Sequence, residues 1–219
     1  MFANRHVLAV GGGEFVLLVA QDVVHPNVHQ MALAAGWNGQ SPLRVRFECA
    51  NVNRLEFKAD QHFPGGVSVE ISPATRIGGS RIASTSGLEW AIFVHGGFAS
   101  ELSIDNRGII SAAGGSGLPG SSATATDTAG HSVTASGGAG GEGQGYRPGT
   151  TIIEGPDPGR PGQTACTPGG AWSNPRCATG SSGSPGYEWG KSLYGQTTAV
   201  SGGNKITWLH VGQILGRRG

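Results

Sequence analysis

The sequence is poor in charge. Asp, Glu, Lys and Arg make up 13% of its 219 residues, and the formal net charge is +1. The only clustered cations are Arg217 and Arg218 at the end of the chain. Because nucleic-acid binding depends on a basic surface that neutralises phosphates, this composition argues against a nucleic-acid partner. The low net charge also differs from that of one class of disordered chains, in which high net charge keeps the chain extended.

The sequence also lacks a long hydrophobic run. Its most apolar stretch, HVLAVGGGEFVLLVA at residues 6–20, is too short for a bilayer and contains three glycines and Glu14. Arg5 before it and ALAAG after it fit the flanks of a signal peptide, but a carboxylate inside the apolar part opposes insertion. We therefore expect no membrane insertion.

Cysteine is scarce, with three residues in the chain. Cys49 falls in an alternating strand pattern, which predicts a small core residue. Cys166 and Cys177 flank TPGGAWSNPR, and they either form a disulfide in an oxidising compartment or remain two free thiols. No His or Cys accompanies them at the spacing of metal ligands, so no metal site is predicted.

Catalytic and cofactor motifs are missing as well. The stretch AVGGGEF places Gly11 and Gly13 correctly for a dinucleotide fingerprint, but Val16 stands at the third glycine position. Glu101 and Asp105 would lie on one face of a strand about 13 Å apart, which is wide for a glycosidase pair. We therefore predict no cofactor and no enzymatic activity.

Alternation of apolar and polar residues dominates the first 110 positions. Leu43, Val45, Phe47 and Cys49 share one face, whereas Arg44, Arg46 and Glu48 share the other, and GVSVEI repeats the pattern. The one helical candidate, HQMALAAG, is short. Closely spaced short strands with glycine- and serine-rich turns predict an all-β module, either a sandwich or a small β-solenoid.

Glycine is abundant and unevenly distributed, with 13 residues in 1–110 and 27 in 111–219. We predict a β-rich attachment or trimerisation module at 1–110, and a glycine-rich extended region at 111–219 that ends in a short β segment. The glycine blocks show no strict Gly-X-Y period. Ordering glycine costs much backbone entropy, so close packing between copies of the chain, or between strands of one chain, must hold it. Gly114, Gly115, Gly137 and Gly138 are the predicted structural glycines.

Large rings in the glycine-rich background are candidate contact residues. Loops rich in Tyr, Trp, Ser and Gly are typical of binding surfaces, in which rigid rings supply contact area. Trp172, Tyr187, Trp189 and Tyr194 are the candidates. The alternative is that these rings fill gaps in the glycine framework.

Three stretches together resemble bacteriophage tail-fibre and tail-tip proteins. They are MALAAGWNGQSPLRVRF, FASELSIDNRGIISAAGGSG and SGGNKITWLHVGQILGRRG, and they occur in the same order as in that family. The family shows denser Gly-Gly repeats after the strand, whereas Ala112, Ala113, Leu118 and Pro119 interrupt them here.

The resemblance implies a non-enzymatic virion protein that is assembled in the host cytoplasm and attaches the tail to the host surface. It further implies a homo-oligomer, usually a homotrimer, that contacts other tail proteins and a bacterial receptor of protein or glycan nature. Two alternatives remain at this point. One is a structural adapter that joins the tail tip to a separate receptor-binding protein, and the other is a tailspike that cleaves polysaccharide.

Overall fold

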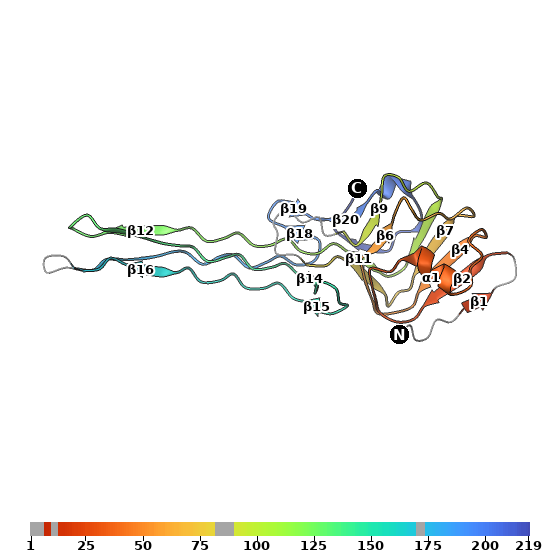
Figure 1. The fold of residues 1–219 in the computed structure, drawn as a ribbon, viewed down its shortest axis with the longest axis horizontal. Coiled ribbons are helices and arrows are strands. Elements are labelled where there is room, and N and C mark those ends of the chain that lie inside the picture. The colour runs from red at the N-terminus through yellow and green to blue at the C-terminus, as the bar shows by residue number, and fades with distance from the viewer. Residues whose placement is uncertain (1–6, 10–12, 82–89, 170–173) are drawn as a thin grey trace.

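The computed structural model describes residues 7–9, 13–81, 90–169 and 174–219. The protein is elongated, with a rounded β module at one end and a long narrow arm projecting from it (Figure 1). Of the described residues, the module contains 7–9, 13–81, 90–112 and 198–218, and the arm contains 113–169 and 174–197. The chain thus leaves the module to build the arm and then returns to it.

The module is a three-sided β-solenoid, in which each turn of the chain adds one strand to each of three sheets. The first sheet has the order β1 (Val7–Ala9), β2 (Phe15–Val19), β4 (Leu43–Phe47), β7 (Val67–Ile71), β10 (Leu102–Asn106) and β21 (Ile206–His210). The second has the order β3 (Val23–Val24), β5 (Asn51–Asn53), β8 (Arg76–Gly78), β11 (Ile109–Ser111) and β22 (Gln213–Leu215). The third contains β6 (Leu55–Phe57), β9 (Ile92–Val94), β20 (Thr198–Ser201) and β23 (Arg217–Arg218).

We call each turn of the solenoid a rung. In the described part of the chain there are five, and neighbouring rungs pair in parallel. The pairing is in register except between rungs four and five, where the first and third sheets each contain a register shift. Rung two is β4–β5–β6, rung three is β7–β8–β9, rung four is β10–β11–β20 and rung five is β21–β22–β23. A short 3₁₀ helix, η1 (Gly203–Lys205), connects rungs four and five. The all-β prediction is confirmed, and of its two alternatives the solenoid is the one observed.

The alternation read in the sequence fills the solenoid core. In β4 the side chains of Leu43, Val45 and Phe47 are buried, whereas Arg44 and Arg46 point outward. Because the rungs are in register, Val45 lies beside Val69 of β7, which lies beside Ile104 of β10. Apolar columns of this kind run through the module, and Cys49 is buried with them, as predicted.

Helix α1 (Val28–Ala34) replaces the third strand of rung one. It begins at Asn27, whose side chain accepts a hydrogen bond from the Gln30 amide, as expected of an N-cap. Val28 and Ala32 are buried against the module core. The segment HQMALAAG, which the sequence suggested as the helical candidate, therefore does form a helix.

The arm is an insertion between β11 and β20 of rung four. After it, β20 pairs with β9 of the preceding rung, and β21 pairs with β10. The boundary proposed from the sequence, at residue 110, falls within β11 (Ile109–Ser111). The C-terminal β segment, however, completes the solenoid and is not part of the distal region, because residues 198–218 form strands of the module sheets.

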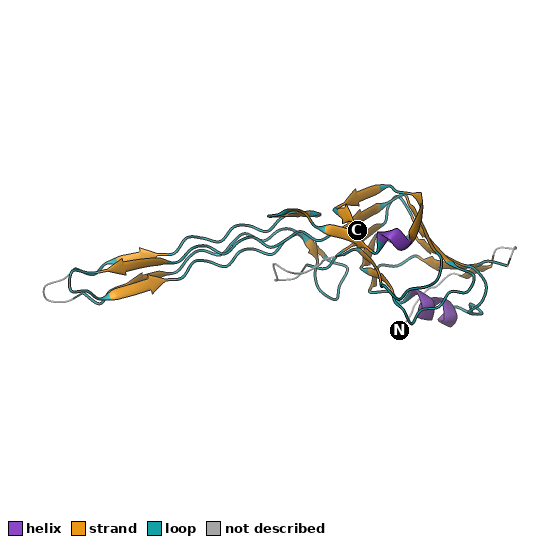
Figure 2. Cartoon of the chain, turned by 90° about the horizontal axis from the view of Figure 1, so that it is seen from above, coloured by secondary structure: helices purple, strands orange, loops and turns teal. Residues whose placement is uncertain are grey.

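The arm consists of four extended segments that run side by side (Figures 1 and 2). They are segment one (113–122), segment two (136–144), segment three (155–163) and segment four (180–188). Two hairpins close the far end, namely β12 (Ala123–Thr126) with β13 (Ser132–Ala135), and β16 (Thr164–Cys166) with β17 (Cys177–Thr179). At the base, β14 (Gly145–Tyr146) pairs with β15 (Ile153–Glu154), and β18 (Lys191–Ser192) pairs with β19 (Gly195–Gln196).

Hydrogen bonds at every third residue hold the four segments together. Between segments one and two, the amides of Gly114, Gly117 and Gly120 donate to the carbonyls of Gln144, Gly141 and Gly138. Segments two and three, three and four, two and four, and four and one are joined by the same three-residue pattern, with N···O distances of 2.7–3.0 Å. This period, with no bonds inside a segment, is that of extended left-handed helices with three residues per turn.

Glycine is required where the segments touch. A Cβ atom on Gly114 would overlap the Tyr187 carbonyl oxygen, and one on Gly138 would overlap that of Arg160. On Gly137 it would overlap the Gly120 carbonyl, and on Gly115 it would lie 2.9 Å from the Ser192 Cβ. All four predicted structural glycines therefore occupy tight contacts. Of the two kinds of packing left open by the sequence, strands of one chain form these contacts.

The sequence analysis found no strict three-residue period of glycine, and within the four segments this interpretation was wrong. Glycine recurs every third residue at positions 114, 117 and 120, at 137, 140 and 143, at 159 and 162, and at 180, 183 and 186. The period is lost only where hairpins and base loops interrupt it. Pro119, Pro161 and Pro185 lie between these glycines and Pro158 directly precedes Gly159, and the fixed backbone angle of proline suits the same extended helix.

A small core and a buried arginine fix the arm to the module. Tyr146 and Trp189 pack edge to face with ring centroids 5.7 Å apart, beside Ala113. Arg81, which follows β8 and is 3% exposed, contacts carboxylates of the arm at 2.6–3.0 Å. Those carboxylates belong to Glu142, Glu154 and Asp157. A cation from the module is thus surrounded by anions from the arm.

Candidate functional site

The far end of the arm carries two hairpins that pack against each other. Strand β13 of the first hairpin contacts both strands of the second, and β12 contacts β17. Ala135 and Ala178 are buried in these hairpins. Small alanine side chains on the inner faces allow the two hairpins to approach closely. The arm therefore ends in one compact tip, which we call the distal tip (described residues 123–135, 164–169 and 174–179).

The exposed faces of the distal tip are lined with hydroxyl groups. Thr124 and Thr134 lie opposite each other with their Oγ1 atoms 3.0 Å apart, and Thr126 lies 2.7 Å from the Ser132 hydroxyl. In the second hairpin, Thr164 lies 2.9 Å from Thr179. Cross-strand threonine pairs stabilise hairpins and leave donor and acceptor capacity toward solvent. These faces can form hydrogen bonds while carrying no charge.

Asp127 organises the loop at the tip of the first hairpin. Its Oδ1 accepts hydrogen bonds from the amides of Ala129 and His131, at 2.9 and 3.0 Å. Its Oδ2 lies 3.0 Å from Nδ1 of His131. The hydrogen bond with the His131 ring is the main reason that the pKa of Asp127 lies below its ordinary value. One buried carboxylate thus fixes a loop of five residues.

A disulfide closes the loop at the tip of the second hairpin. Cys166 and Cys177 are directly opposite each other in β16 and β17, and the structure joins them covalently. Beyond them, the Thr167 amide donates to the Arg176 carbonyl, and the Arg176 amide donates to the Thr167 hydroxyl. Of the two alternatives for this cysteine pair, the disulfide is the one found.

The four rings predicted as contact residues do not gather at one place. Trp172 belongs to the loop that the disulfide closes, and it lies outside the described residues. Tyr187 is half-buried at the base end of segment four, and Tyr194 is 86% exposed between β18 and β19. Trp189 is only 9% exposed and packs on Tyr146, so the contact role predicted for it is wrong. Its ring fills a gap where the arm meets the module, which we call the joint (Tyr146, Trp189 and Arg81), and this was the alternative interpretation.

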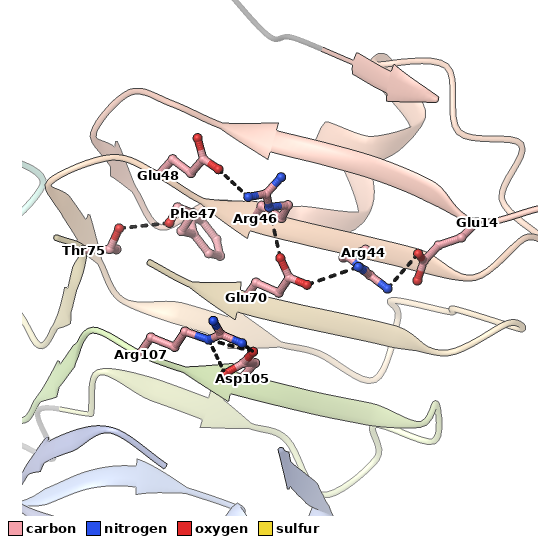
Figure 3. Close-up of polar contacts among 9 residues, drawn as sticks. All are labelled: Glu14, Arg44, Arg46, Phe47, Glu48, Glu70, Thr75, Asp105 and Arg107. Atoms are coloured by element: carbon pink, nitrogen blue, oxygen red, sulfur yellow. Dashed lines mark hydrogen bonds and ion pairs between the residues drawn. The ribbon is translucent and has the colours of Figure 1, made fainter. Parts of the chain in front are cut away.

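The outer face of the first sheet carries a separate group of charges (Figure 3). Glu70 bridges Arg44 at 3.3 Å and Arg46 at 3.0 Å, and Arg44 also contacts Glu14. Asp105, on the neighbouring strand, contacts Arg107 at 3.0 Å. Of these residues, Arg46, Glu70, Asp105 and Arg107 line a hollow on this face.

This hollow contains the carboxylates that could form the catalytic pair of a glycosidase. Asp105 is in register with Glu70 of β7, and Glu101, the partner suggested by the sequence, precedes β10. Both neighbouring carboxylates, Glu70 and Asp105, are engaged by arginine side chains. A glycoside hydrolase needs one carboxyl group that is protonated and able to donate its proton to the leaving oxygen. An arginine-paired ladder of this kind is better explained as stabilising the outer face of the sheet.

Among the described residues, no three His, Cys, Asp or Glu side chains are arranged to hold a metal ion. Within the same residues, no helix is both long and apolar enough to cross a bilayer.

Sequence reasoning missed Asp127 and the threonine pairs. The signal was present in ATATDTAGHSVTA at residues 123–135, where two alternating stretches flank an Asp-x-x-Gly turn. Such a pattern predicts a hairpin. Because glycine and serine are abundant on both sides of it, the sequence analysis assigned these residues to the glycine-rich extended region.

Comparison with known proteins gives two matches. A family model described as "Phage tail fibre adhesin Gp38" matches residues 14–219. The crystal structure of the gp37–gp38 adhesin tip complex of the bacteriophage S16 long tail fibre is 18% identical in sequence to this chain. That match has a TM-score of 0.43 and covers 92% of this chain and 81% of the other. No curated protein matches the chain.

Proposed function

Since the chain belongs to the Gp38 family of phage tail fibre adhesins, we propose that its distal tip is the surface that contacts the bacterial receptor. Family membership makes the protein a component of the phage tail that acts in host recognition. The finer assignment divides the molecule in two. The arm presents the distal tip to the host, and the solenoid module attaches to other proteins of the tail.

The observation that carries this proposal is the construction of the arm. Four segments of about nine residues each, at roughly 3.1 Å per residue, place the distal tip about 28 Å from the joint. Hydrogen bonds at every third residue and glycine contacts make this spacer stiff. At its end, Asp127 fixes one loop and a disulfide closes the other. A stiff spacer that ends in two hairpins is suited to binding at a distance from the tail.

The receptor is a protein or a glycan of the bacterial surface, and both fit the chemistry of the tip. The hydroxyl faces can form hydrogen bonds with either. Trp172, in the disulfide-closed loop, is the ring that we propose as a contact residue at the distal tip. Tyr187 and Tyr194, which lie near the joint, belong to a different surface and are secondary candidates.

A non-enzymatic role is part of this proposal. It is supported by the adhesin family and by the pairing of Glu70 and Asp105 with arginines on the solenoid face. The alternative of a structural adapter predicts no contact between the distal tip and the host. The same experiment separates the two functions.

The test measures binding of the purified, fluorescently labelled protein to host cells. Three tip variants, Trp172→Ala, Thr128→Glu and Arg176→Glu, change the two loops, and Lys58→Glu on the exposed surface of the module is the control. Truncating a ring at the centre of an interface often costs about 2 kcal/mol, which is roughly thirty-fold in affinity. We expect each tip variant to lose at least ten-fold in binding and the control to stay within two-fold.

The result must be read together with folding. Each variant is first compared with the parent by circular dichroism and thermal melting, so that a loss of binding reflects the contact. If the parent protein binds no host cells, and particles with all three tip changes adsorb at the normal rate, the adapter alternative replaces the adhesin assignment.

A further inference from the structure

The two ends of the solenoid are built differently. At rung one, α1 occupies the third side and β1 runs antiparallel to β2. At rung five, β21, β22 and β23 are all parallel to the strands of rung four, and within the described residues no strand pairs with their outer edges. We call this open end the rung-five face (residues 206–218). It stands on the same side of the molecule as the β18–β19 hairpin (Figure 1).

Apolar side chains are exposed on and beside the rung-five face. Leu209 is 64% exposed and Val211 is 37% exposed. Trp208 and Ile214 lie at the end of the solenoid core and are only partly covered. On the adjacent hairpin, Leu193 and Tyr194 are exposed, and the Arg217 guanidinium of β23 lies beside Gly195 of that hairpin. Four of the large apolar residues that the structure shows as exposed thus belong to one side of the protein.

The C-terminal segment on this side also carries positive charge. Residues 198–219 contain Lys205, Arg217 and Arg218 and no Asp or Glu. The guanidinium of Arg218 lies 5.8 Å from the Trp208 ring centroid, so it covers the end of the core without an anionic partner. Lys205 donates to the carbonyls of Gly96 and Phe98 and lines a hollow with Glu14 and Glu101. Arg217 and Arg218 form no ion pair with another described residue, so they are the uncompensated cations of the rung-five face. Elsewhere in the module, by contrast, arginines such as Arg44 and Arg46 are paired with carboxylates.

We infer that the rung-five face is the surface by which the module docks on the tail, and that its partner is a tail protein with an acidic rim around an apolar centre. This inference rests on the proposed function and gives its attachment side a location and a chemistry. The apolar centre of the face is formed by Trp208, Leu209 and Val211. The cations around it select an acidic partner, because opposite charges steer association and like charges oppose it.

The same charges argue against a second copy of this chain as the occupant. Two rung-five faces brought together would place Arg217 and Arg218 of one copy against those of the other, with no carboxylate between them. The register shift at Ile104 and Asp105 makes Leu209 an extra residue in β21, which interrupts the regular edge of the first sheet. Docking therefore relies on side chains more than on continued strand pairing.

The test uses phage particles produced without this protein, to which the purified protein is added. The amount of protein bound per particle is measured by immunoblotting, and adsorption to host cells is measured separately. The variants are Leu209→Asp with Val211→Asp, and Arg217→Glu with Arg218→Glu. Matched controls are Leu33→Asp, which changes an exposed apolar residue on α1, and Lys58→Glu, which reverses an exposed charge on the module.

We expect both rung-five variants to bind particles at least ten-fold less well than the parent, and both controls to bind within two-fold of it. All four side chains changed in the rung-five variants are exposed, and thermal melting identifies any variant that fails to fold. If a variant does not fold, Leu209→Ser with Val211→Ser and Arg217→Gln with Arg218→Gln replace it. Normal particle binding by folded rung-five variants overturns the inference.

Two further outcomes are distinct. If the purified protein forms a dimer that Leu209→Asp abolishes, the occupant is a second copy and the inference is wrong. If the parent protein binds particles through the rung-five face but does not restore adsorption, the docking inference stands and the proposed adhesin function fails.

Discussion

Gly138 shows how a single hydrogen atom in place of a side chain determines the packing of the arm. A Cβ at this position would overlap the Arg160 carbonyl of segment three, whereas a Cβ on Gly155, at the base end of the same segment, would meet nothing within 4 Å. Neither residue has a positive φ, so the comparison isolates packing from backbone strain.

We therefore predict that Gly138→Ala destabilises the arm by about 1–3 kcal/mol, as overpacking commonly does, and that Gly155→Ala changes its stability by less than about 0.5 kcal/mol. Hydrogen exchange of the arm amides, followed by mass spectrometry, measures the difference. Equal protection in the two variants would show that the segments do not touch as described. We expect alanine at Gly114 or Gly115 to be unfavourable for the same reason.

Trp189 and Tyr194 form a second pair for comparison, five residues apart. Trp189 packs on Tyr146 at the joint, whereas Tyr194 is largely exposed. Truncating a buried Trp typically costs about 3–5 kcal/mol. We expect Trp189→Ala to loosen the joint by about 3 kcal/mol and Tyr194→Ala to leave stability unchanged. Chemical denaturation of the two variants checks this, and similar midpoints would contradict the burial of Trp189.

Asp127 makes the first tip loop sensitive to acid. Because its pKa in the folded protein lies below the unfolded value, its contribution to stability is complete above about pH 4. That contribution is lost as the pH falls through the lower, folded pKa. We expect the Ala129 and His131 amides to be protected at pH 7 and to lose protection in strong acid. Asp127→Asn, which keeps an oxygen acceptor, retains part of this protection at pH 7, and Asp127→Ala retains none. Amide exchange by NMR distinguishes the three proteins.

At the scale of elements, the strands of the module were the easiest to predict. Arg44 and Arg46 alternate with Val45 and Phe47, and one polar and one apolar face suffice to indicate a strand. The helix candidate was correct for a similar local reason, since Asn27 provides an N-cap. The sequence pattern did not predict which strands pair with each other in the sheets. β20 lies beside β9 although the arm separates them in the chain, and no local pattern encodes that contact.

The candidate site was harder to predict because its parts depend on these distant contacts. The spacing of Cys166 and Cys177 in the sequence allowed a disulfide between them, and the structure contains that disulfide. The location of Tyr187, Trp189 and Tyr194 near the joint follows from segment four running back toward the module. That direction is set by hydrogen bonds to segments one, two and three, and a ring in a glycine-rich sequence carries no sign of it.

The disulfide-closed hairpin gives a prediction at this scale. A disulfide stabilises chiefly by limiting the unfolded chain, and here it closes a loop of ten residues. We expect the Cys166→Ser, Cys177→Ser double variant to be cleaved faster by protease after Arg176, while the β12–β13 hairpin is unaffected. Limited proteolysis with trypsin, analysed by mass spectrometry, measures this. Identical cleavage rates in parent and variant would mean that the hydrogen bonds of Thr167 alone hold the loop.

At the scale of the whole molecule, the predicted homotrimer remains a prediction. It followed from the family resemblance and from the need to pack glycine segments against one another, and the structure meets that need within one chain. Sedimentation equilibrium tests it directly, because a trimer of this 22.3 kDa chain has three times the mass of the monomer. A folded monomer at micromolar concentration would contradict the prediction, and the four segments would still be ordered.

The arrangement of hydrogen bonds in the arm has a mechanical consequence. Both ends of the insertion leave the module at the joint, and both hairpins stand at the far end (Figure 1). A pull on the distal tip is therefore shared by four segments, and it acts along them while the hydrogen bonds run across them. Hydrogen bonds loaded in this direction are sheared at the same time and do not break one after another. The arm should thus resist tension along its axis far better than a sideways force that peels one segment away.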